Sequence, residues 1–209
     1  MSLCIVIPMK DPRSSKQRLS DVLAPKEREC IAINLLHKTL RFLTRHFQQH
    51  SVLIVTPSDF IAKIAADYKV DVLLEKSANG LNAAIRNATQ YCIENGFSSQ
   101  LVLPADIINL DLAEFTQLLN IPRTLGSVAI CPSDDGGTNA LISTPPNAID
   151  FHYGIKSSEK HWRCAQQKQM FCQLITLPKL ALDLDTAKDL ARVDTVNLRQ
   201  LTNPITAFA

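Results

Sequence analysis

Apolar runs of strand length alternate along the chain with longer stretches of helical periodicity, a pattern that predicts an α/β fold with a largely parallel sheet. Each run is continuous enough to be buried on both faces of the sheet. We expect strands at residues 3–8, 51–56, 70–74, 101–104 and 127–131. The firmest helices are expected at 25–46, where Pro25 suits the first helical position, and at 81–92, where Asn95 and Gly96 end the pattern.

Length and composition favour one soluble domain over residues 1–209, because no linker, repeat or low-complexity tract divides the chain. The net charge of +2 is too small to make nucleic acid or an anionic membrane the expected partner. No apolar run approaches the ~18 residues of a membrane span, residues 1–8 carry no basic leader, and the six cysteines form no C-x-x-C pair. We therefore expect a cytoplasmic protein that binds small molecules, while a homo-oligomer remains open.

The loop after the first expected strand is basic and contains no glycine. It offers the side chains of Lys10, Arg13, Lys16 and Arg18. Glycine-rich phosphate loops are absent from the whole chain, which disfavours a Rossmann dehydrogenase and a P-loop NTPase. Ligands of α/β sheets bind beyond the carboxyl ends of the strands, so these cations could neutralise a triphosphate and stabilise the pyrophosphate that leaves it. A solvated basic loop is the alternative.

Three aspartates are candidate metal ligands. Asp106 follows the expected strand 101–104, and Asp183 and Asp185 lie in an extended stretch where residues two apart face the same way. Magnesium takes oxygen ligands, commonly one or two carboxylates together with substrate phosphates, so the two segments could share one Mg²⁺. The alternatives are structural: Asp106 as a turn former or helix N-cap, and Asp185 as a cap of the last helices.

Four of the six glycines fall in three short polar motifs that could bind ligands through backbone N–H groups. Gly80 and Asn82 precede a helix and could contact a base or ribose. Thr138 follows a Gly-Gly pair and offers its hydroxyl to an anion. Gly154 and Ser157 precede another helix, whose N-terminus favours anions. Each motif could equally be a plain turn.

His161 and Lys156 stay without a definite role at this point. A lone histidine is more often a packing residue than a catalytic base, and nucleotidyl transfer to an ionised phosphate requires no base. Lys156 lies beside Ser157 and adds a positive charge to that segment.

Six short motifs follow one another with sensible spacing over most of the chain. They are I-P-M-K with S-K-Q-R-L (7–10 and 15–19), G-L-N (80–82), L-P-A-D (103–106), G-T-N-A-L (137–141), G-I-K-S-S-E-K-H (154–161) and L-D-L-D-T (182–186). Together they resemble the 2-phospho-L-lactate guanylyltransferase family of deazaflavin coenzyme F-420 biosynthesis. The chain departs from the family pattern at Asn109, near a usual proline and leucine, and at Lys156, which replaces the second glycine of G-x-G-S.

The resemblance implies a nucleotidyltransferase-type three-layer α/β sandwich, a mostly parallel mixed sheet with one reversed strand and helices on both faces. It implies attack by the phosphate of an acceptor on the α-phosphorus of GTP, with release of pyrophosphate. The acceptor would be 2-phospholactate, phosphoenolpyruvate or 3-phosphoglycerate. The implied roles are Mg²⁺ binding by Asp106, Asp183 and Asp185, pyrophosphate stabilisation by Lys10, Lys16 and Arg18, acceptor binding by Thr138, Gly154 and Ser157, and nucleotide binding by Gly80 and Asn82.

Two rival functions remain. Asp183-Leu184-Asp185 is formally a D-x-D motif, as in GT-A glycosyltransferases, but there it typically follows the central strand, where this chain has the single Asp106. A non-catalytic nucleotide-binding domain is the other rival, and retention of the three aspartates and two lysines argues against it.

Overall fold

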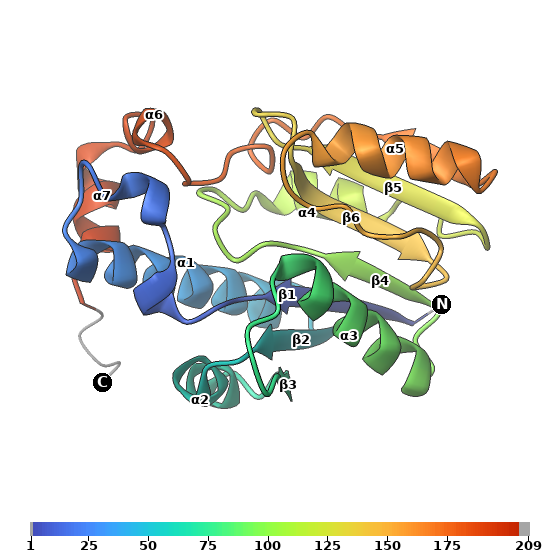
Figure 1. Ribbon diagram of the computed structural model, residues 1–209, viewed down its shortest axis with the longest axis horizontal. Helices are drawn as coiled ribbons and strands as arrows, with labels where there is room; N and C mark the ends of the chain where they lie inside the picture. The colour runs from blue at the N-terminus through green and yellow to red at the C-terminus, as the bar shows by residue number, and fades with distance from the viewer. Residues whose placement is uncertain (1, 205–209) are drawn as a thin grey trace.

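A seven-stranded mixed sheet forms the middle layer of the molecule (Figure 1). The computed structural model describes residues 2–204. The strands are β1 (Leu3–Pro8), β2 (Ser51–Thr56), β3 (Asp71–Leu74), β4 (Ser99–Val102), β5 (Ser127–Pro132), β6 (Thr138–Thr144) and β7 (Phe171–Leu174). Their order is β3-β2-β1-β4-β6-β5-β7, and β6 alone runs antiparallel to its neighbours. The prediction of a mostly parallel sheet with one reversed strand is confirmed.

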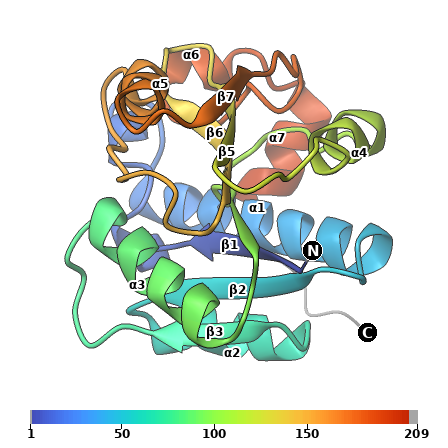
Figure 2. The same cartoon turned by 90° about the vertical axis from the view of Figure 1, so that its right-hand side faces the viewer.

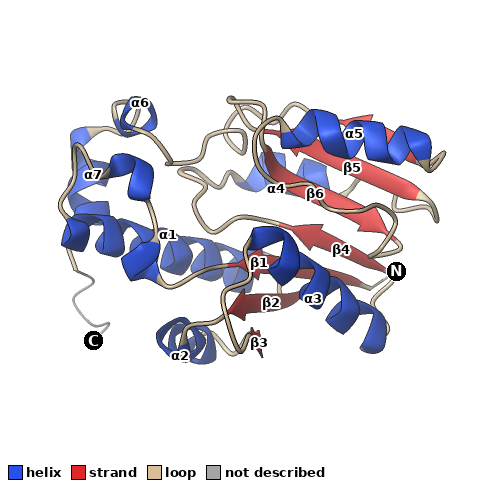
Figure 3. Cartoon of the chain, in the orientation of Figure 1, coloured by secondary structure: helices blue, strands red, loops and turns tan. Residues whose placement is uncertain are grey.

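Helices cover both faces of this sheet, as the view along its edge shows (Figure 2). The helices are α1 (Pro25–His46), α2 (Asp59–Asp67), α3 (Leu81–Glu94), α4 (Leu112–Leu119), α5 (Ser157–Gln167), α6 (Ala187–Leu190) and α7 (Thr195–Thr202), with 3₁₀ turns η1 (Pro12–Ser14) and η2 (Gln17–Leu19). Helices α1, α2 and α4 pack on one face, and α3 and α5 pack on the other (Figure 3). Among the described residues, no helix combines the length and the hydrophobicity that crossing a bilayer requires.

The sequence pattern located most of these elements. The helix 25–46 is found with the expected bounds, and α3 extends two residues beyond the expected end. The fourth strand lies two residues earlier than expected, because its pairing with β6 ends at Val102. Burial of every strand on both faces is wrong for β3, whose ends are exposed, because it is an edge strand with one neighbour.

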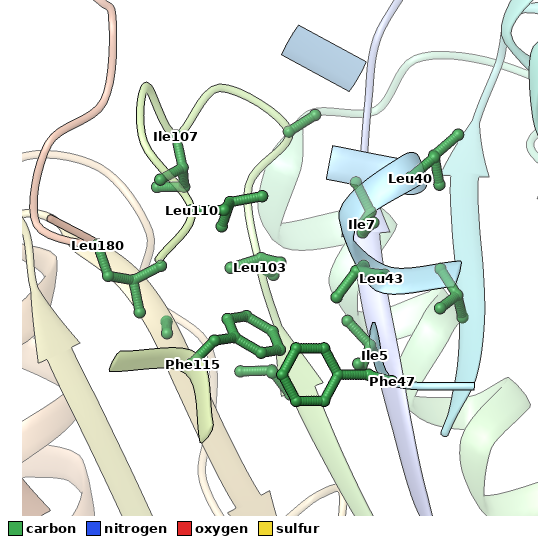
Figure 4. Packing of buried hydrophobic residues seen from close by; sticks show 14 of the residues in the cluster. Ile5, Ile7, Leu40, Leu43, Phe47, Leu103, Ile107, Leu110, Phe115 and Leu180 are labelled. Carbon is green, nitrogen blue, oxygen red and sulfur yellow. The ribbon is translucent and has the colours of Figure 1, made fainter. Parts of the chain in front are cut away.

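The larger core lies between β1 and α1 (Figure 4). Side chains alternate along a strand, so Ile5 and Ile7 face α1, where they pack with Leu40 and Leu43. At the far end of α1, the Phe47 ring packs against Phe115 of α4, with centroids 4.9 Å apart. This packing fixes β1 and therefore the basic loop that leaves it.

A returning segment after β7 brings the carboxyl-terminal part of the chain beside the end of β4 (Figure 1). Ile108 donates its N–H to the Leu182 carbonyl (3.0 Å), and Leu184 donates to the Asp106 carbonyl (3.1 Å). Leu184 is fully buried and packs with Ile31 and Leu35 of α1. Because residues on either side of Leu184 in an extended segment face the other way, its burial directs the flanking aspartates away from α1.

We expect Leu184→Ala to lower the free energy of unfolding by about 2–5 kcal/mol, because it removes a buried side chain and leaves a cavity against α1. Denaturant titration measures this change. The matched control is Leu125→Ala, since Leu125 is 82% exposed and its truncation should change stability by no more than about 0.5 kcal/mol. Equal effects at the two leucines would contradict the packing role of Leu184.

Candidate active site

A cavity of about 510 Å³ opens where the carboxyl ends of β1 and β4 meet. Parallel strands bring the loops at their carboxyl ends to one edge of the sheet, and in open α/β sheets this edge binds ligands. Among the residues that line the cavity are Lys10, Lys16, Glu75, Gly80, Asp106 and Asp185. The basic loop and the acidic segments predicted to act together therefore share one cavity.

The three predicted metal ligands lie together. Asp106, Asp183 and Asp185 each offer a carboxylate oxygen, and these oxygens all lie within 4.8 Å of one another. The pairing of the returning segment with residues 106–108 produces this arrangement. Asp185 is not the cap of α6, because Thr186 holds that position and shares a capping box with Asp189.

Lys16 is the buried counter-ion of this acidic cluster. Its Nζ lies 2.6 Å from Asp106 Oδ2 and 3.1 Å from Asp185 Oδ1. Burial alone would lower the pKa of Lys16, but the attraction of the two carboxylates outweighs it, so the pKa is raised and the ammonium stays charged. The Arg18 guanidinium lies 3.8 Å from Asp185 and adds a second positive charge at the rim.

Asp183 is the carboxylate of the cluster whose pKa is raised most clearly. Burial, together with the charges of Asp106 and Asp185, raises its pKa from 3.8 to about 6, against a lowering by the Asn139 amide. Three converging carboxylates with a single buried lysine leave an excess of negative charge. A hard divalent cation with oxygen ligands matches both this donor set and this charge, so the residues present fit Mg²⁺.

The predicted acceptor residues meet at the start of β6. The register of β5 with β6 shifts between Cys131 and Pro132, so β6 carries one extra residue, a β-bulge that re-aims its side chains. Thr138 therefore faces α5, where its hydroxyl lies 2.9 Å from the Ser157 hydroxyl. The neighbouring Asn139 faces the acidic cluster, with its amide 3.4 Å from Asp183 Oδ1. Gly154 accepts the Ser157 N–H at 3.1 Å.

The two predicted nucleotide residues have different surroundings. Gly80 lines the cavity and caps α3 with φ of 87°, a backbone conformation that favours glycine. The Asn82 amide lies outside that lining: it accepts the Tyr153 N–H (2.8 Å) and donates to the Tyr153 carbonyl (3.2 Å). Asn82 thus holds α3 against the segment that leads to Gly154.

Among the basic loop residues, Lys10 lines the cavity, whereas Arg13 is paired with Asp11 at 2.8 Å. Sequence reasoning missed Glu75, a lining residue that follows β3 and accepts a hydrogen bond from Asn87 (2.9 Å). The signal that pointed to Asp106, an acidic residue just after an apolar run, also applied to Glu75. Asn139 belonged to a recognised motif, but the bulge that directs it gave no pattern in the sequence.

In metal-free protein at about pH 7.5, we expect Asp183→Asn to raise the free energy of unfolding by roughly 1–2 kcal/mol. Because the folded-state pKa is raised, Asp183 favours folding only when protonated. That contribution is complete below about pH 4 and is lost as the pH rises through about 6. The stabilisation by asparagine should therefore vanish near pH 4.

Denaturant titration in a chelating buffer at the two pH values measures this difference. The control is Asp21→Asn, which changes an exposed aspartate outside the cluster and should not stabilise the protein. If Asp183→Asn changed the free energy of unfolding equally at both pH values, repulsion among the three carboxylates would not be its cause.

Comparisons with known proteins show which family the chain belongs to. The family model described as "Guanylyl transferase CofC like" matches residues 3–195. The 3-phospho-D-glycerate guanylyltransferase of Colwellia psychrerythraea is 48% identical over 97% of this chain and 93% of its own length. The phosphoenolpyruvate guanylyltransferase of Rubrobacter xylanophilus is 32% identical over 93% and 94%, and the 2-phospho-L-lactate guanylyltransferase of Methanothermobacter thermautotrophicus is 29% identical over 92% and 84%.

Solved structures show the same fold at low sequence identity. A nucleotidyl transferase from Methanothermobacter superposes with a TM-score of 0.66 at 13% identity, over 95% of this chain and 98% of that one. A 4-diphosphocytidyl-2C-methyl-D-erythritol synthase gives a TM-score of 0.58 at 14% identity, over 97% and 99%. The fold is that of nucleotidyltransferases, and the family model with the 48% identical relative shows that this chain belongs to the CofC-like guanylyltransferase family.

Proposed function

We propose that this guanylyltransferase joins GMP from GTP to the phosphate of a three-carbon acid and releases pyrophosphate, with Mg²⁺ as cofactor. The observation that carries the proposal is the cluster of Asp106, Asp183 and Asp185 around the Lys16 ammonium at one edge of the sheet. Such a cluster suits a reaction between two phosphates, whose mutual repulsion is the main barrier to their approach.

The three aspartates would hold Mg²⁺. When bound, the ion supplies positive charge that neutralises and aligns the phosphates of both substrates. The chain itself adds Lys10 on the cavity wall and Lys16 in its depth, which favour the negative charge of the leaving pyrophosphate, with Arg18 at the rim. The attacking phosphate oxygen is already ionised, so no residue has to remove a proton.

Thr138, Gly154 and Ser157 are proposed to hold the acceptor, and Gly80 the nucleotide, with Asn82 supporting it through Tyr153. Among the candidate acceptors, 3-phosphoglycerate has the strongest support, because the relative of that name is 48% identical, against 32% and 29% for the phosphoenolpyruvate and phospholactate enzymes. A role in coenzyme F-420 biosynthesis and a cytoplasmic location stay predictions.

The two rival functions lose support. The D-x-D segment, residues 183–185, forms one cluster with Asp106 instead of a separate pair of carboxylates. Family membership favours a guanylyltransferase over a glycosyltransferase, and the relatives that match nearly the whole chain are named as enzymes.

A panel assay tests the proposal directly. Purified protein is incubated with each nucleoside triphosphate crossed against 3-phosphoglycerate, phosphoenolpyruvate and 2-phospholactate, and products are identified by mass. We expect a guanylylated acid and pyrophosphate, only with Mg²⁺ and both substrates present. Pyrophosphate release with no acid, or a product with a sugar nucleotide, would overturn the proposal.

We expect Asp106→Asn to abolish turnover while the thermal midpoint changes little. The carboxylate serves the cation, and the loss of its ion pair with Lys16 is offset by relief of repulsion within the cluster. Calorimetry and pyrophosphate release measure the two quantities. Retained activity with a large fall in the midpoint would return Asp106 to a structural role.

We expect Lys156→Gly to change the ranking of the three acceptors more than the KM for GTP, because Lys156 lies beside Ser157 at the start of α5. The backbone tolerates the change, since Lys156 has φ of 53°, where glycine is favoured. Lys156→Asn removes the same charge without the added backbone freedom of glycine, because asparagine also tolerates this conformation, and it should change the ranking in the same direction. An unchanged ranking in both variants would show that the lysine takes no part in acceptor choice.

A further inference from the structure

His161 belongs to the motif of residues 154–161, the proposed reaction assigns it no task, and it is fully buried although its helix lies at the surface. It lies on α5 with no exposed area, and its ring packs edge-on against Tyr153, with centroids 4.8 Å apart. Both ring nitrogens have partners. Nε2 lies 2.9 Å from the backbone N–H of His152, and Nδ1 lies 3.1 Å from the Thr138 hydroxyl.

These partners determine where the imidazole proton lies. A backbone N–H can only donate, so Nε2 must be the accepting nitrogen. A neutral imidazole then carries its proton on Nδ1, and Nδ1 donates to the Thr138 hydroxyl oxygen. Burial, followed by the nearby His152 and Lys160, lowers the pKa of His161 to about 4, so the ring is neutral at physiological pH.

The proton on Nδ1 controls what the neighbouring hydroxyls can offer. Thr138 and Ser157 share one hydrogen bond of 2.9 Å, which uses one of their two hydroxyl hydrogens. If Nδ1 were an acceptor, it would take the second hydrogen. Because Nδ1 donates instead, one O–H of the pair remains, and in the described part of the chain no protein acceptor is paired with it.

We propose that His161 is a positioning residue that keeps the Thr138–Ser157 hydroxyl pair as a hydrogen-bond donor toward the carboxylate of the acceptor. This inference rests on the proposed function, in which the pair contacts the acceptor. The phosphate end of the acceptor belongs at the acidic cluster, where it must meet GTP. The carboxylate is the other anionic group of a phosphorylated three-carbon acid, and a hydroxyl polarised by a neighbouring donor suits it.

The first test reads the tautomer without any reaction. Nitrogen-15 spectra of protein labelled at histidine should show His161 with a protonated Nδ1 and an unprotonated Nε2, from pH 6 to pH 8. A protonated Nε2, or an imidazolium in this range, would overturn the proposal. This result does not depend on which substrates the enzyme uses.

The second test measures recognition of the carboxylate. The wild-type enzyme and variants are compared on 3-phosphoglycerate and on its analogue with a carboxamide in place of the carboxylate. His161→Phe removes the donor that orients and polarises the hydroxyl pair, so the remaining O–H is free to turn away from the acceptor. The preference for the carboxylate should fall by up to roughly tenfold, while the KM for GTP changes by no more than about twofold.

His161→Gln should restore most of the preference, because its amide can accept from His152 N–H and donate to Thr138. His152→Ala is the matched control: it removes an exposed imidazole from the same wall but retains the backbone N–H, so the preference should stay at the wild-type value. If His161→Phe does not fold, the proposal is tested by the carboxylate preference of His161→Gln and by the tautomer seen in the spectra.

The outcomes separate the two hypotheses. Wild-type protein that guanylylates none of the three acids would refute the proposed function. Wild-type protein that is active, with the same carboxylate preference in His161→Phe, would refute only the role of His161. A parallel rise in the KM values of GTP and acceptor in the phenylalanine variant would also overturn it, since that pattern indicates general damage to the fold.

Discussion

The mutual repulsion of three carboxylates in a half-buried site is the constraint on which the rest of this structure depends. Asp106, Asp183 and Asp185 converge within 4.8 Å, and only Lys16 is buried among them as a counter-charge. Such an arrangement costs stability unless a cation or a ligand compensates it. The raised pKa of Asp183 expresses that cost. In the proposed function this excess negative charge is what a divalent cation would compensate.

Two local features of the backbone assemble this site from distant segments. Burial of Leu184 against α1 fixes the direction of the aspartates on either side of it, and the pairing of residues 106–108 with the returning segment sets their distance from Asp106. On β6, the bulge at Asn139 reverses the facing of Thr138 and Asn139 relative to the rest of the strand, so that Thr138 faces α5 and Asn139 faces the acidic cluster. The proposed metal side and the proposed acceptor side therefore begin at adjacent residues of one strand.

The sequence was sufficient for the parts of the fold that follow simple periodicity. The bounds of α1 and the strand before the basic loop were predicted, because a wide apolar stripe and a continuous apolar run leave little choice. The grouping of the three aspartates was predicted from the position of Asp106 after a strand, from the extended stretch that holds Asp183 and Asp185, and from family motifs. The contacts of Asn82 with Tyr153, the place of Glu75 in the cavity and the tautomer of His161 depend on tertiary contacts, for which the sequence has no periodic signal.

In the proposed site, the phosphate and the carboxylate of the acceptor would be bound by different kinds of interaction. This difference bears on why relatives are named for different acids. Cation and lysine charge attract any phosphate and discriminate little among acids that share it. In our proposal, the hydroxyls aligned by His161 would donate to the carboxylate of any acid long enough to reach them. The acids then differ in their length and in the groups between phosphate and carboxylate, which the turn at residues 154–157 would have to accommodate in the proposed site. Lys156, with its left-handed backbone and its charge, lies in that turn, so a change of acceptor needs no change in the metal site.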